Sequence, residues 1–579
     1  MAYGTHHRQG SGGPSRQPNA GSGNNPLGTL LVIGAAAAVA VGLGLWVAGG
    51  MAMAVTGHPW PKLSWKVFEG ALVGAFTHGG HPGRSWPAPY GAAMPAAAIY
   101  WLFVALELAV LGTIVVLVVR RMLNRSQRGN TVWWARPADL GQLIVKRPPA
   151  NRVILGRLRG TEVAAAAADS VAVVGVTGMG KTVTLAVPAA LRWTQGPRLV
   201  TSVKVDDQIR DTQTHARSLG QVQIFDPSGS YPGERARWSP LSECGHPDHA
   251  RRTVAGLVDA VSYARSDRQD PFWRQAAVEL LAPLFHAAAL DNKTMRDLLR
   301  WVSRRTTDEA LAVLQAHGVV ELADGLRGVL RTEDPRTLGN VWATVQGMLS
   351  PYREQSVLQA TEATDIDLDR FLAGTNTLYL VAPLLEQARF RPIFEALIRA
   401  LLGRAERLAM ASPTGSLPLP LLLLLDEAAN FAALSDLDHV VSTCRSLGIT
   451  VVTIWQDVAQ VRARYGDRAD TILSNHKARL LFGASGDPAT LQWASGLIGQ
   501  EERGRWSTSI GASGERSRTH SVEQRQLVPT ERLRQLGWGH AVLIYANLPP
   551  AELTLRHWRE DRALRRLTEP PAAAAAGGR

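Results

Sequence analysis

Residues 175–182 read Gly-Val-Thr-Gly-Met-Gly-Lys-Thr, a glycine-rich loop that ends in a lysine and a threonine. An apolar run, SVAVV at 170–174, precedes this loop, and a segment typical of a helix follows it at 183–191. A strand, a glycine loop with Lys-Thr, and a helix in this order predict a P-loop. The sequence therefore predicts a site for the phosphates of a nucleoside triphosphate.

Each residue type in such a loop has a chemical task. Backbone N–H groups of the glycine loop cradle phosphate oxygens, and the helix N-terminus adds its partial positive charge. We expect Lys181 to reach the β- and γ-phosphates and Thr182 to hold Mg²⁺. The residues expected to bind the nucleotide are Gly175, Thr177, Gly178, Gly180, Lys181 and Thr182.

A pair of carboxylates follows a second apolar run. Leucines dominate residues 419–425, and Asp426 and Glu427 come directly after them. A nearly continuous apolar run suits a strand buried on both faces, and its carboxyl end is where ligands bind in open α/β sheets. Combined with a P-loop, this is a Walker B pattern. Asp426 would contact Mg²⁺ through bound water, and Glu427 would activate the attacking water.

Two further polar residues flank the next predicted strand, ITVVTIW at 449–455. Gln456 follows that strand and could contact the γ-phosphate or the attacking water. Arg445 precedes it, in the segment CRSLG at 444–448. An arginine there could stabilise transition-state charge, also in a neighbouring subunit. From these residues alone we favour a solvated cation at a helix end.

Cysteine and histidine residues predict neither a disulfide framework nor a metal site. Cys244 and Cys444 are the two cysteines and lie far apart, which fits a reducing compartment. The cluster CGHPDH at 244–249 contains metal-ligating types, but no second Cys/His group of matching spacing accompanies it.

The composition is globular and basic. Of 579 residues, 46% are hydrophobic and 19% are charged, with a formal net charge of +13. Seven of the 62 cationic residues are lysines and the other 55 are arginines. A basic balance suits nucleic acid or an anionic membrane surface, and an arginine-rich genome explains it equally well.

Two apolar segments predict a membrane anchor. Residues 27–55 carry no charge, and a second span runs over 96–119 with Glu107 near its middle. For Glu107 we favour a seam between helices over a functional role. Arginines follow the second span at once, namely Arg120, Arg121, Arg125 and Arg128. By the positive-inside rule, the N-terminus and everything after the second span are cytoplasmic. Ala52-Met53-Ala54 resembles a signal-peptidase site, but we favour an uncleaved anchor.

Small residues in the first span, Gly34, Ala38 and Gly42, recur at four-residue spacing that would let another helix approach closely.

The remaining chain alternates strands and helices, as expected for a parallel sheet covered by helices. We expect strands at 153–157, 199–205, 221–225, 377–382, 477–483 and 541–546, the last being the final strand. A Ser/Arg/Gly-rich stretch at 503–521 is interpreted as a mobile surface loop. We expect a disordered tail at 1–26, an anchor with two transmembrane helices at 27–123 and a linker at 124–150. The nucleotide-binding domain is expected in two parts, 151–249 and 364–560, separated by an all-α insertion at 250–363. An Ala/Gly-rich tail is expected at 561–579.

The ordered set of motifs resembles a known family. The two predicted spans come first. The motifs that follow them, in chain order, are VAVVGVTGMGKT, TSVKVDD, IFDPSG, WSPL, LLLLLDEAANF, TIWQD and LVPTERLRQLGWGHAVLIYANLPP. This is similar to the type IV secretion coupling proteins, the TraG/TraD-like conjugative DNA-transfer ATPases, especially those of high-GC Gram-positive bacteria. The resemblance covers about residues 153–561 plus the membrane layout. It departs at Ala428, Ala429 and Asn430, where many members carry a phenylalanine and a small residue.

The resemblance implies a RecA-like P-loop motor in the plasma membrane, with ATP and Mg²⁺ as cofactors. It implies a homo-hexamer that moves single-stranded DNA with its attached relaxase toward type IV secretion channel proteins, and an all-α insertion that recruits cargo. It supports the roles given above to Lys181, Thr182, Asp426 and Glu427. It also matches Arg445 to an arginine finger and Gln456 to a sensor.

Two alternatives stay open. One is a double-stranded-DNA translocase of the FtsK type, which usually has more spans and a C-terminal winged-helix reader. We see no room for such a reader before the Ala/Gly-rich end at 572–578. The other is a scaffold that docks secreted protein cargo and uses ATP only as a structural ligand.

Overall fold

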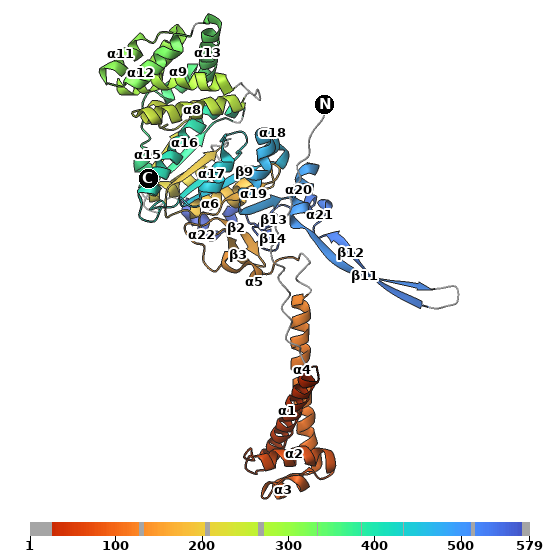
Figure 1. Cartoon of the computed structure of the whole chain (residues 1–579). Helices are drawn as coiled ribbons and strands as arrows, with labels where there is room; N and C mark the ends of the chain where they lie inside the picture. Colours follow the sequence, from red (N-terminus) through yellow and green to blue (C-terminus); the bar gives the residue numbers. More distant parts are fainter. Residues whose placement is uncertain are drawn as a thin grey trace, which may run out of the picture. The chain divides into compact units, whose positions relative to one another are not determined.

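The computed structural model describes residues 26–126, 133–202, 209–264, 271–332, 334–383, 385–431, 434–483, 485–510 and 516–569. The chain forms two compact units, Met1–Asn130 and Thr131–Arg579 (Figure 1).

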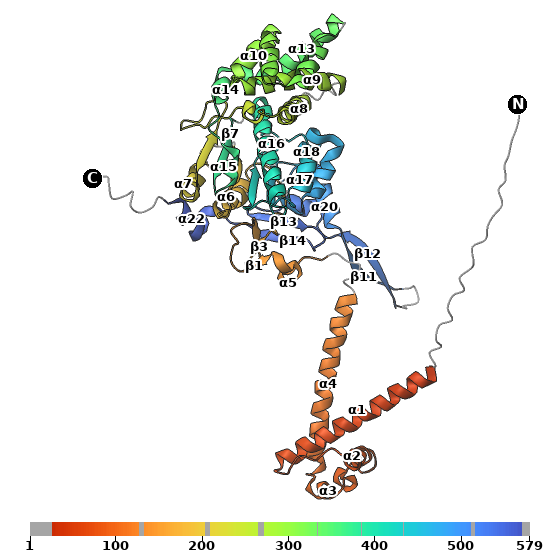
Figure 2. The ribbon, with the colours of Figure 1, turned by 60° about the vertical axis from the view of Figure 1, so that its left-hand side comes forward.

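The first unit is built on two long helices, α1 (Pro26–Val55) and α4 (Ala97–Ser126), with short elements between them (Figure 2). These short elements are α2 (Trp65–Thr77), a 3-10 turn (Pro82–Ser85) and α3 (Tyr90–Ala93). Among the described residues, the stretch Ala97–Leu117 of α4 is long and apolar enough to cross a membrane, whereas in α1 the apolar stretch is the shorter Val39–Val55. One predicted span thus has a matching helix, and the second stays a prediction.

Small residues of α1 pack inside this unit. A Cβ atom added to Gly42 would come within 2.3 Å of the Phe68 ring of α2. A Cβ atom on Gly44 would lie 3.4 Å from Glu107 Oε2 of α4. Gly42 is therefore covered by α2 within the same chain. Glu107 lies in the seam between α1 and α4, as we predicted, and its Oε1 atom is buried without a hydrogen-bond partner in the described part of the chain.

The second unit is built on a sheet of 12 strands in the order β1-β3-β2-β14-β13-β10-β4-β9-β8-β5-β7-β6. The strands β10, β4, β9, β8, β5, β7 and β6 run parallel, and the remaining pairs are antiparallel. Their bounds are β1 Ile144–Val145, β2 Ile154–Leu158, β3 Thr161–Ala164, β4 Val171–Val174, β5 Arg198–Ser202, β6 Val222–Phe225, β7 Thr377–Val381, β8 Leu421–Leu425, β9 Ile449–Trp455, β10 Ala478–Phe482, β13 His540–Tyr545 and β14 Ala551–Thr554. Residues 203–208, which include the end of the strand predicted at 199–205, lie outside the described residues.

The leucine strand β8 is central, as its sequence predicts. It lies between β9 and β5, and all five of its side chains are buried. Leu421, Leu423 and Leu425 belong to one hydrophobic core, and Leu422 and Leu424 belong to the core on the other face. A strand with apolar residues at every position is stable where helices cover both faces of the sheet.

Helices cover the sheet and extend beyond it (Figure 1). Next to the sheet lie α6 (Val187–Arg192), α7 (Arg210–Leu219), α15 (Leu368–Leu372), α16 (Gln387–Ala411), α17 (Leu437–Thr443), α18 (Val458–Tyr465), α19 (Ala469–Asn475), α20 (Pro488–Ile498), α21 (Thr530–Arg534) and α22 (Arg562–Thr568). Besides α15, the α-helices described between β6 and β7 are α8 (Pro247–Ala264), α9 (Pro271–Leu290), α10 (Met295–Arg304), α11 (Asp308–Ala316), α12 (Val320–Leu330), α13 (Pro335–Met348) and α14 (Gln355–Ala360). Their buried residues are continuous with one core of the sheet.

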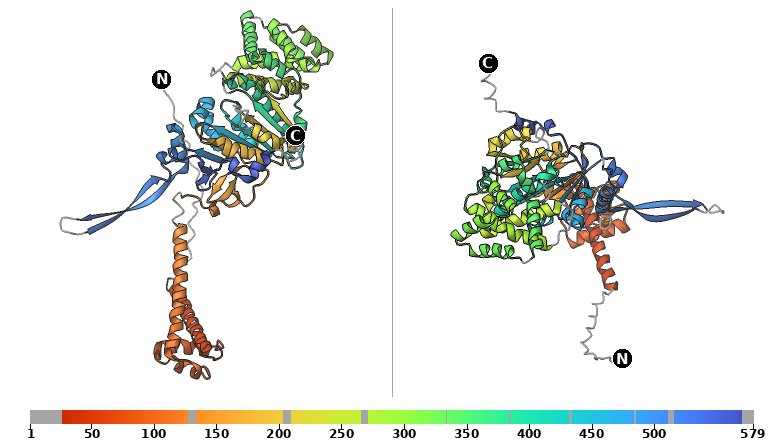
Figure 3. Two further views of the ribbon diagram at one scale, coloured as in Figure 1. Left: turned by 180° about the vertical axis from the view of Figure 1, so that it is seen from behind. Right: turned by 90° about the horizontal axis from the view of Figure 1, so that it is seen from above.

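Two sequence interpretations are wrong. Residues 503–510 and 516–521 are not a loop, because β11 (Gln500–Ile510) pairs with β12 (Arg516–Gln526) in an antiparallel hairpin (Figure 3). The strand at 541–546 is not the last one, since β14 follows β13. Helix α22 lies within 561–579, the region predicted as an Ala/Gly-rich tail, and that division of the chain stays a prediction. The hairpin escaped prediction because its strands are polar and lack the alternation that indicates a half-buried strand.

Candidate nucleotide site

The sheet order brings the predicted site residues to one edge. Strand β4 pairs with β9, and β9 pairs with β8, all in parallel. The P-loop follows β4, Asp426 and Glu427 follow β8, and Gln456 follows β9. The carboxyl ends of parallel strands meet at the same edge of a sheet. A backbone hydrogen bond of 3.1 Å, from the Gly175 N–H to the Trp455 carbonyl, joins the carboxyl ends of β4 and β9.

Glycine conformations shape the P-loop. Gly178 and Gly180 have φ angles of +88° and +85°, which favour glycine. A Cβ atom on Gly180 would also lie 2.9 Å from the indole nitrogen of Trp538. The loop leads into a π-helical turn, Thr182–Ala186, and then into α6. The predicted helix after the loop is therefore present, with a wider first turn.

Lys181 points back into the loop. Its Nζ donates to the carbonyl of Gly175 and, at 3.0 Å, to that of Val176. Burial lowers the pKa of Lys181, while the nearby Glu427 and Asp426 carboxylates oppose that shift. A buried ammonium group beside the loop's backbone N–H groups is a phosphate-binding arrangement.

Thr182 and Asp426 meet although 244 residues separate them. The Thr182 hydroxyl donates to Asp426 Oδ2 at 3.0 Å, and the Glu427 N–H donates to Oδ1 at 3.0 Å. Burial raises the pKa of Asp426 to about 6, and the neighbouring Glu427 charge adds to this rise. A hydroxyl and a buried carboxylate are hard oxygen ligands, and a divalent cation would offset the charge that burial disfavours. These two residues fit Mg²⁺.

Glu427 and Gln456 are also brought together. Gln456 Nε2 donates to Glu427 Oε2 at 3.2 Å and lies 3.4 Å from Oε1. Glu427 has a φ angle of +54°, a left-handed conformation that is uncommon for glutamate and clusters at functional sites. The carboxylate is thus held by a side-chain amide beside the P-loop lysine.

Arg445 is the one predicted site residue that lies elsewhere. It belongs to the turn before β9, at the amino edge of the parallel strands, and its Nε forms an ion pair with Asp169 Oδ1 at 3.1 Å. Asp169 in turn precedes β4. The four residues of β4 alone span roughly 13 Å, so Arg445 is far from its own P-loop.

Two supporting features were missed by sequence reasoning. Trp538 lies over Gly180 and is 47% exposed. In the sequence it stands between two glycines, a pattern that indicates a close backbone contact but does not identify the residue that is contacted. Behind β9, the indole N–H of Trp455 donates to Thr453 Oγ1 at 2.8 Å, and Thr453 Oγ1 lies 3.0 Å from His476 Nε2. These buried contacts fix the strand end that carries Gln456.

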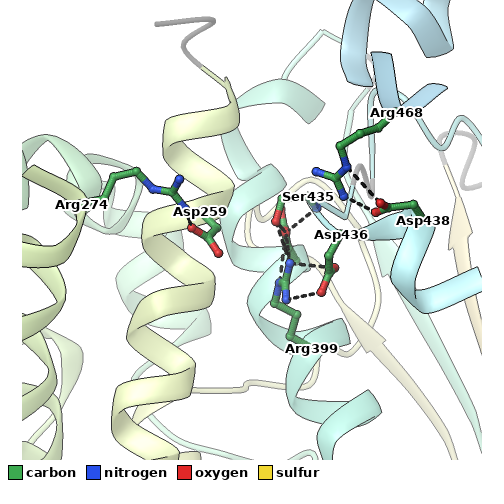
Figure 4. Close-up of polar contacts among 8 residues, drawn as sticks. Asp259, Arg274, Arg399, Ser435, Asp436, Asp438 and Arg468 are labelled. Atoms are coloured by element: carbon green, nitrogen blue, oxygen red, sulfur yellow. Dashed lines mark hydrogen bonds and ion pairs between the residues drawn. The ribbon is translucent and has the colours of Figure 1, made fainter. Parts of the chain in front are cut away.

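Ionic contacts fix the segment after Glu427 (Figure 4). Arg399 of α16 contacts Glu395 at 3.1 Å and Asp436 at 2.8 Å. Glu395, which is fully buried, also accepts a bond of 2.8 Å from the Ser435 N–H. Arg468 pairs with Asp438 on α17. Arg399 and the buried Glu395 thus tie Ser435 and Asp436 to α16, and Arg468 ties α17 to the turn before α19.

Comparisons with known proteins identify the family of this chain. A family model described as "Type IV secretory system Conjugative DNA transfer" matches residues 141–576. The conjugal transfer protein TraG of Rhizobium radiobacter is 25% identical over 391 residues, which are 64% of this chain and 59% of that protein. TraG of Agrobacterium fabrum is 23% identical over 404 residues, 66% of this chain and again 59% of that protein. The chain thus matches about 59% of the length of these curated relatives.

Solved structures show the same fold. The bacterial conjugative coupling protein TrwBdeltaN70, in its unbound form, has a TM-score of 0.58 and 19% identity over 74% of this chain and 92% of its own. TrwB in complex with ADP and Mg²⁺ has a TM-score of 0.56 and 20% identity over 74% of this chain and 94% of its own. The predicted RecA-like α/β fold with a parallel-rich sheet is therefore confirmed. By the match over residues 141–576, the chain belongs to the type IV secretory system conjugative DNA-transfer family.

Proposed function

We propose that this chain is a membrane-anchored ATPase that couples ATP hydrolysis to transfer of single-stranded DNA, with its attached relaxase, into a type IV secretion channel. The observation that carries the proposal is the meeting of Lys181, Thr182, Asp426, Glu427 and Gln456 at one edge of the sheet. Family membership gives this site its context, and the relative TrwB has been described with ADP and Mg²⁺ and with an ATP analogue.

The site residues divide the chemistry of hydrolysis. Backbone N–H groups of Gly175, Thr177, Gly178 and Gly180 bind phosphate oxygens, and Lys181 contacts the β- and γ-phosphates. Thr182 and Asp426 would hold Mg²⁺, which supplies the positive charge that neutralises the phosphate oxygens.

Water activation falls to Glu427. Its carboxylate takes the proton of the attacking water, and the Gln456 amide, already bonded to it at 3.2 Å, sets its orientation and senses the γ-phosphate.

Arg445 completes the site from a second copy of the chain. Its position at the opposite edge of the sheet prevents it from serving its own nucleotide. We propose that this edge lies against the nucleotide site of the next copy in a closed ring. A homo-hexamer with an arginine finger acting in trans satisfies this geometry, and the finger stabilises charge in the transition state.

The anchor holds this motor at the plasma membrane. We propose two spans, α1 and α4, with the N-terminus and the ATPase unit in the cytoplasm because arginines follow α4. The helical insertion at 250–363 is proposed to recruit cargo, within the division 27–123, 151–249, 250–363 and 364–560.

The test is ATP hydrolysis by the full chain in detergent, without DNA and with single- or double-stranded DNA. We expect single-stranded DNA to stimulate turnover, and Lys181→Ala and Glu427→Gln to abolish it. Lys181→Ala should weaken ATP binding, whereas Glu427→Gln should retain it. Glu321→Gln, an exposed glutamate on α12, is the matched control and should hydrolyse ATP like the wild type.

The same assay separates the alternatives. Stimulation by double-stranded DNA alone would favour a translocase of the FtsK type. Nucleotide binding without turnover under every DNA condition would overturn the motor and favour a docking scaffold.

A further inference from the structure

We propose that Asp169 is a positioning residue for Arg445: it holds the guanidinium group by Nε so that the terminal nitrogens serve the nucleotide site of a neighbouring copy. The inference rests on the proposed function, in which Arg445 acts in trans. The two residues form an ion pair of 3.1 Å between Nε and Asp169 Oδ1.

Strand register brings the pair together. Asp169 lies just before β4 and Arg445 lies in the turn just before β9, and these strands are parallel neighbours that pair from Val171 and Val452 onward. Their amino ends therefore meet at the edge opposite the P-loop. The turn that carries Arg445 is closed by bonds from Gly448 N–H to the Arg445 carbonyl, 3.2 Å, and from Ile449 N–H to the Cys444 carbonyl, 2.9 Å.

Asp169 is a rigid acceptor. Its side chain is 5% exposed, and the Tyr545 hydroxyl donates to its Oδ2 atom. The same hydroxyl accepts a bond of 3.0 Å from the Ala166 N–H. Ala168, the residue before Asp169, has a φ angle of +58°, a left-handed conformation that persists where the surroundings fix it. Burial raises the pKa of Tyr545, so the hydroxyl stays a donor.

Arg445, by contrast, is open to a partner. Its side chain is 57% exposed, and an ion pair with so exposed an arginine adds little to folding stability. The contact uses Nε, whereas recognition of phosphate by arginine uses the planar fork of N–H groups. Asp169 Oδ1 accepts no hydrogen bond from the described residues, so the carboxylate attracts Nε by charge at 3.1 Å. This attraction restricts the rotamers of Arg445 and leaves its terminal nitrogens for a phosphoryl group.

The test is a double-mutant cycle on the full chain in detergent with single-stranded DNA, using Asp169→Asn, Arg445→Ala and the double variant. Asp169→Asn keeps the side-chain shape but loses the charge. We expect its kcat to fall about tenfold while the KM for ATP stays within about twofold, because misplacing a catalytic group lowers turnover. The double variant should be no slower than Arg445→Ala, because both changes remove the same contribution. Asp324→Asn, an exposed aspartate on α12, is the control and should match the wild type.

Thermal unfolding midpoints of the same proteins separate positioning from a structural role. The expected midpoint of Asp169→Asn is close to that of the wild type. If that variant fails to fold, Tyr545→Phe, which frees Oδ2 but keeps the carboxylate charge, should lower kcat at constant KM. Wild-type turnover in Asp169→Asn, or losses that multiply in the double variant, would overturn the role of Asp169 while Arg445 stands. Wild-type turnover in Arg445→Ala would overturn both the finger and this inference, with nucleotide binding and hydrolysis still intact.

Discussion

Gly180 shows how one residue type decides whether the nucleotide site can form. Its φ angle of +85° suits glycine, and a Cβ atom would meet the Trp538 indole at 2.9 Å. Gly180→Ala should therefore weaken binding of a fluorescent ATP analogue by about tenfold or more, since the left-handed conformation alone costs roughly 1–2 kcal/mol for an L-residue. The Trp538→Ala change in the same protein should restore only the steric part of this loss.

Gly486→Ala is the matched control for that experiment, because nothing lies within 4 Å of its added Cβ. It should bind nucleotide like the wild type. Equal affinity of Gly180→Ala and wild type would show that the loop tolerates a side chain and that Trp538 does not confine it.

At the scale of elements, the buried hydrogen bonds behind β9 make stability depend on pH. His476 Nδ1 lies 2.8 Å from the Ile472 carbonyl and must donate to it, so Nε2 accepts from the Thr453 hydroxyl. Burial lowers the pKa of His476 from 6.5 to about 4. Between these values the unfolded chain binds a proton that the folded chain does not, so stability falls as pH falls. The loss should reach about 3 kcal/mol near pH 4.

Denaturant unfolding of the full chain in detergent at several pH values measures this slope. His476→Asn, which keeps an amide donor near Ile472, removes the titrating ring. Its stability should change less than that of the wild type between pH 6.5 and 4, while the contribution of other histidines cancels in the comparison. Parallel curves for the two proteins would show that His476 does not control acid sensitivity.

The elements and the contacts between them also explain which parts of the site could be predicted from the sequence. The P-loop, the Walker B strand and Gln456 could be proposed from the sequence because each lies in a short run whose residue types and order are tied to chemistry. The neighbours that hold them come from distant segments: Trp538 on Gly180, Asp169 on Arg445 and Arg399 on Ser435. Such contacts depend on strand order and register, which periodicity does not reveal. The prediction of the hairpin β11–β12 failed for a different reason, because its polar sequence shows no alternation of apolar residues.

At the scale of the whole molecule, the positions of Lys181 and Arg445 at opposite edges of one sheet predict that no single chain is a complete enzyme. Lys181→Ala lacks a working P-loop but keeps its finger, and Arg445→Ala has the reverse defect. Each should be inactive alone. Mixed and allowed to assemble, they should recover up to roughly a quarter of wild-type turnover, because in a closed ring about that share of sites pairs an intact loop with an intact finger.

The measurement is DNA-stimulated hydrolysis as the ratio of the two variants changes, with co-assembly checked by pull-down of one tagged variant. Turnover should peak near equal amounts and vanish at either extreme. The variant Lys181→Ala/Arg445→Ala, mixed with Arg445→Ala, supplies no finger and should recover nothing. If mixtures that co-assemble stayed inactive at every ratio, Arg445 would not act across a subunit boundary. The pairing of Arg445 with Asp169 at the amino edge of the sheet would then need another explanation.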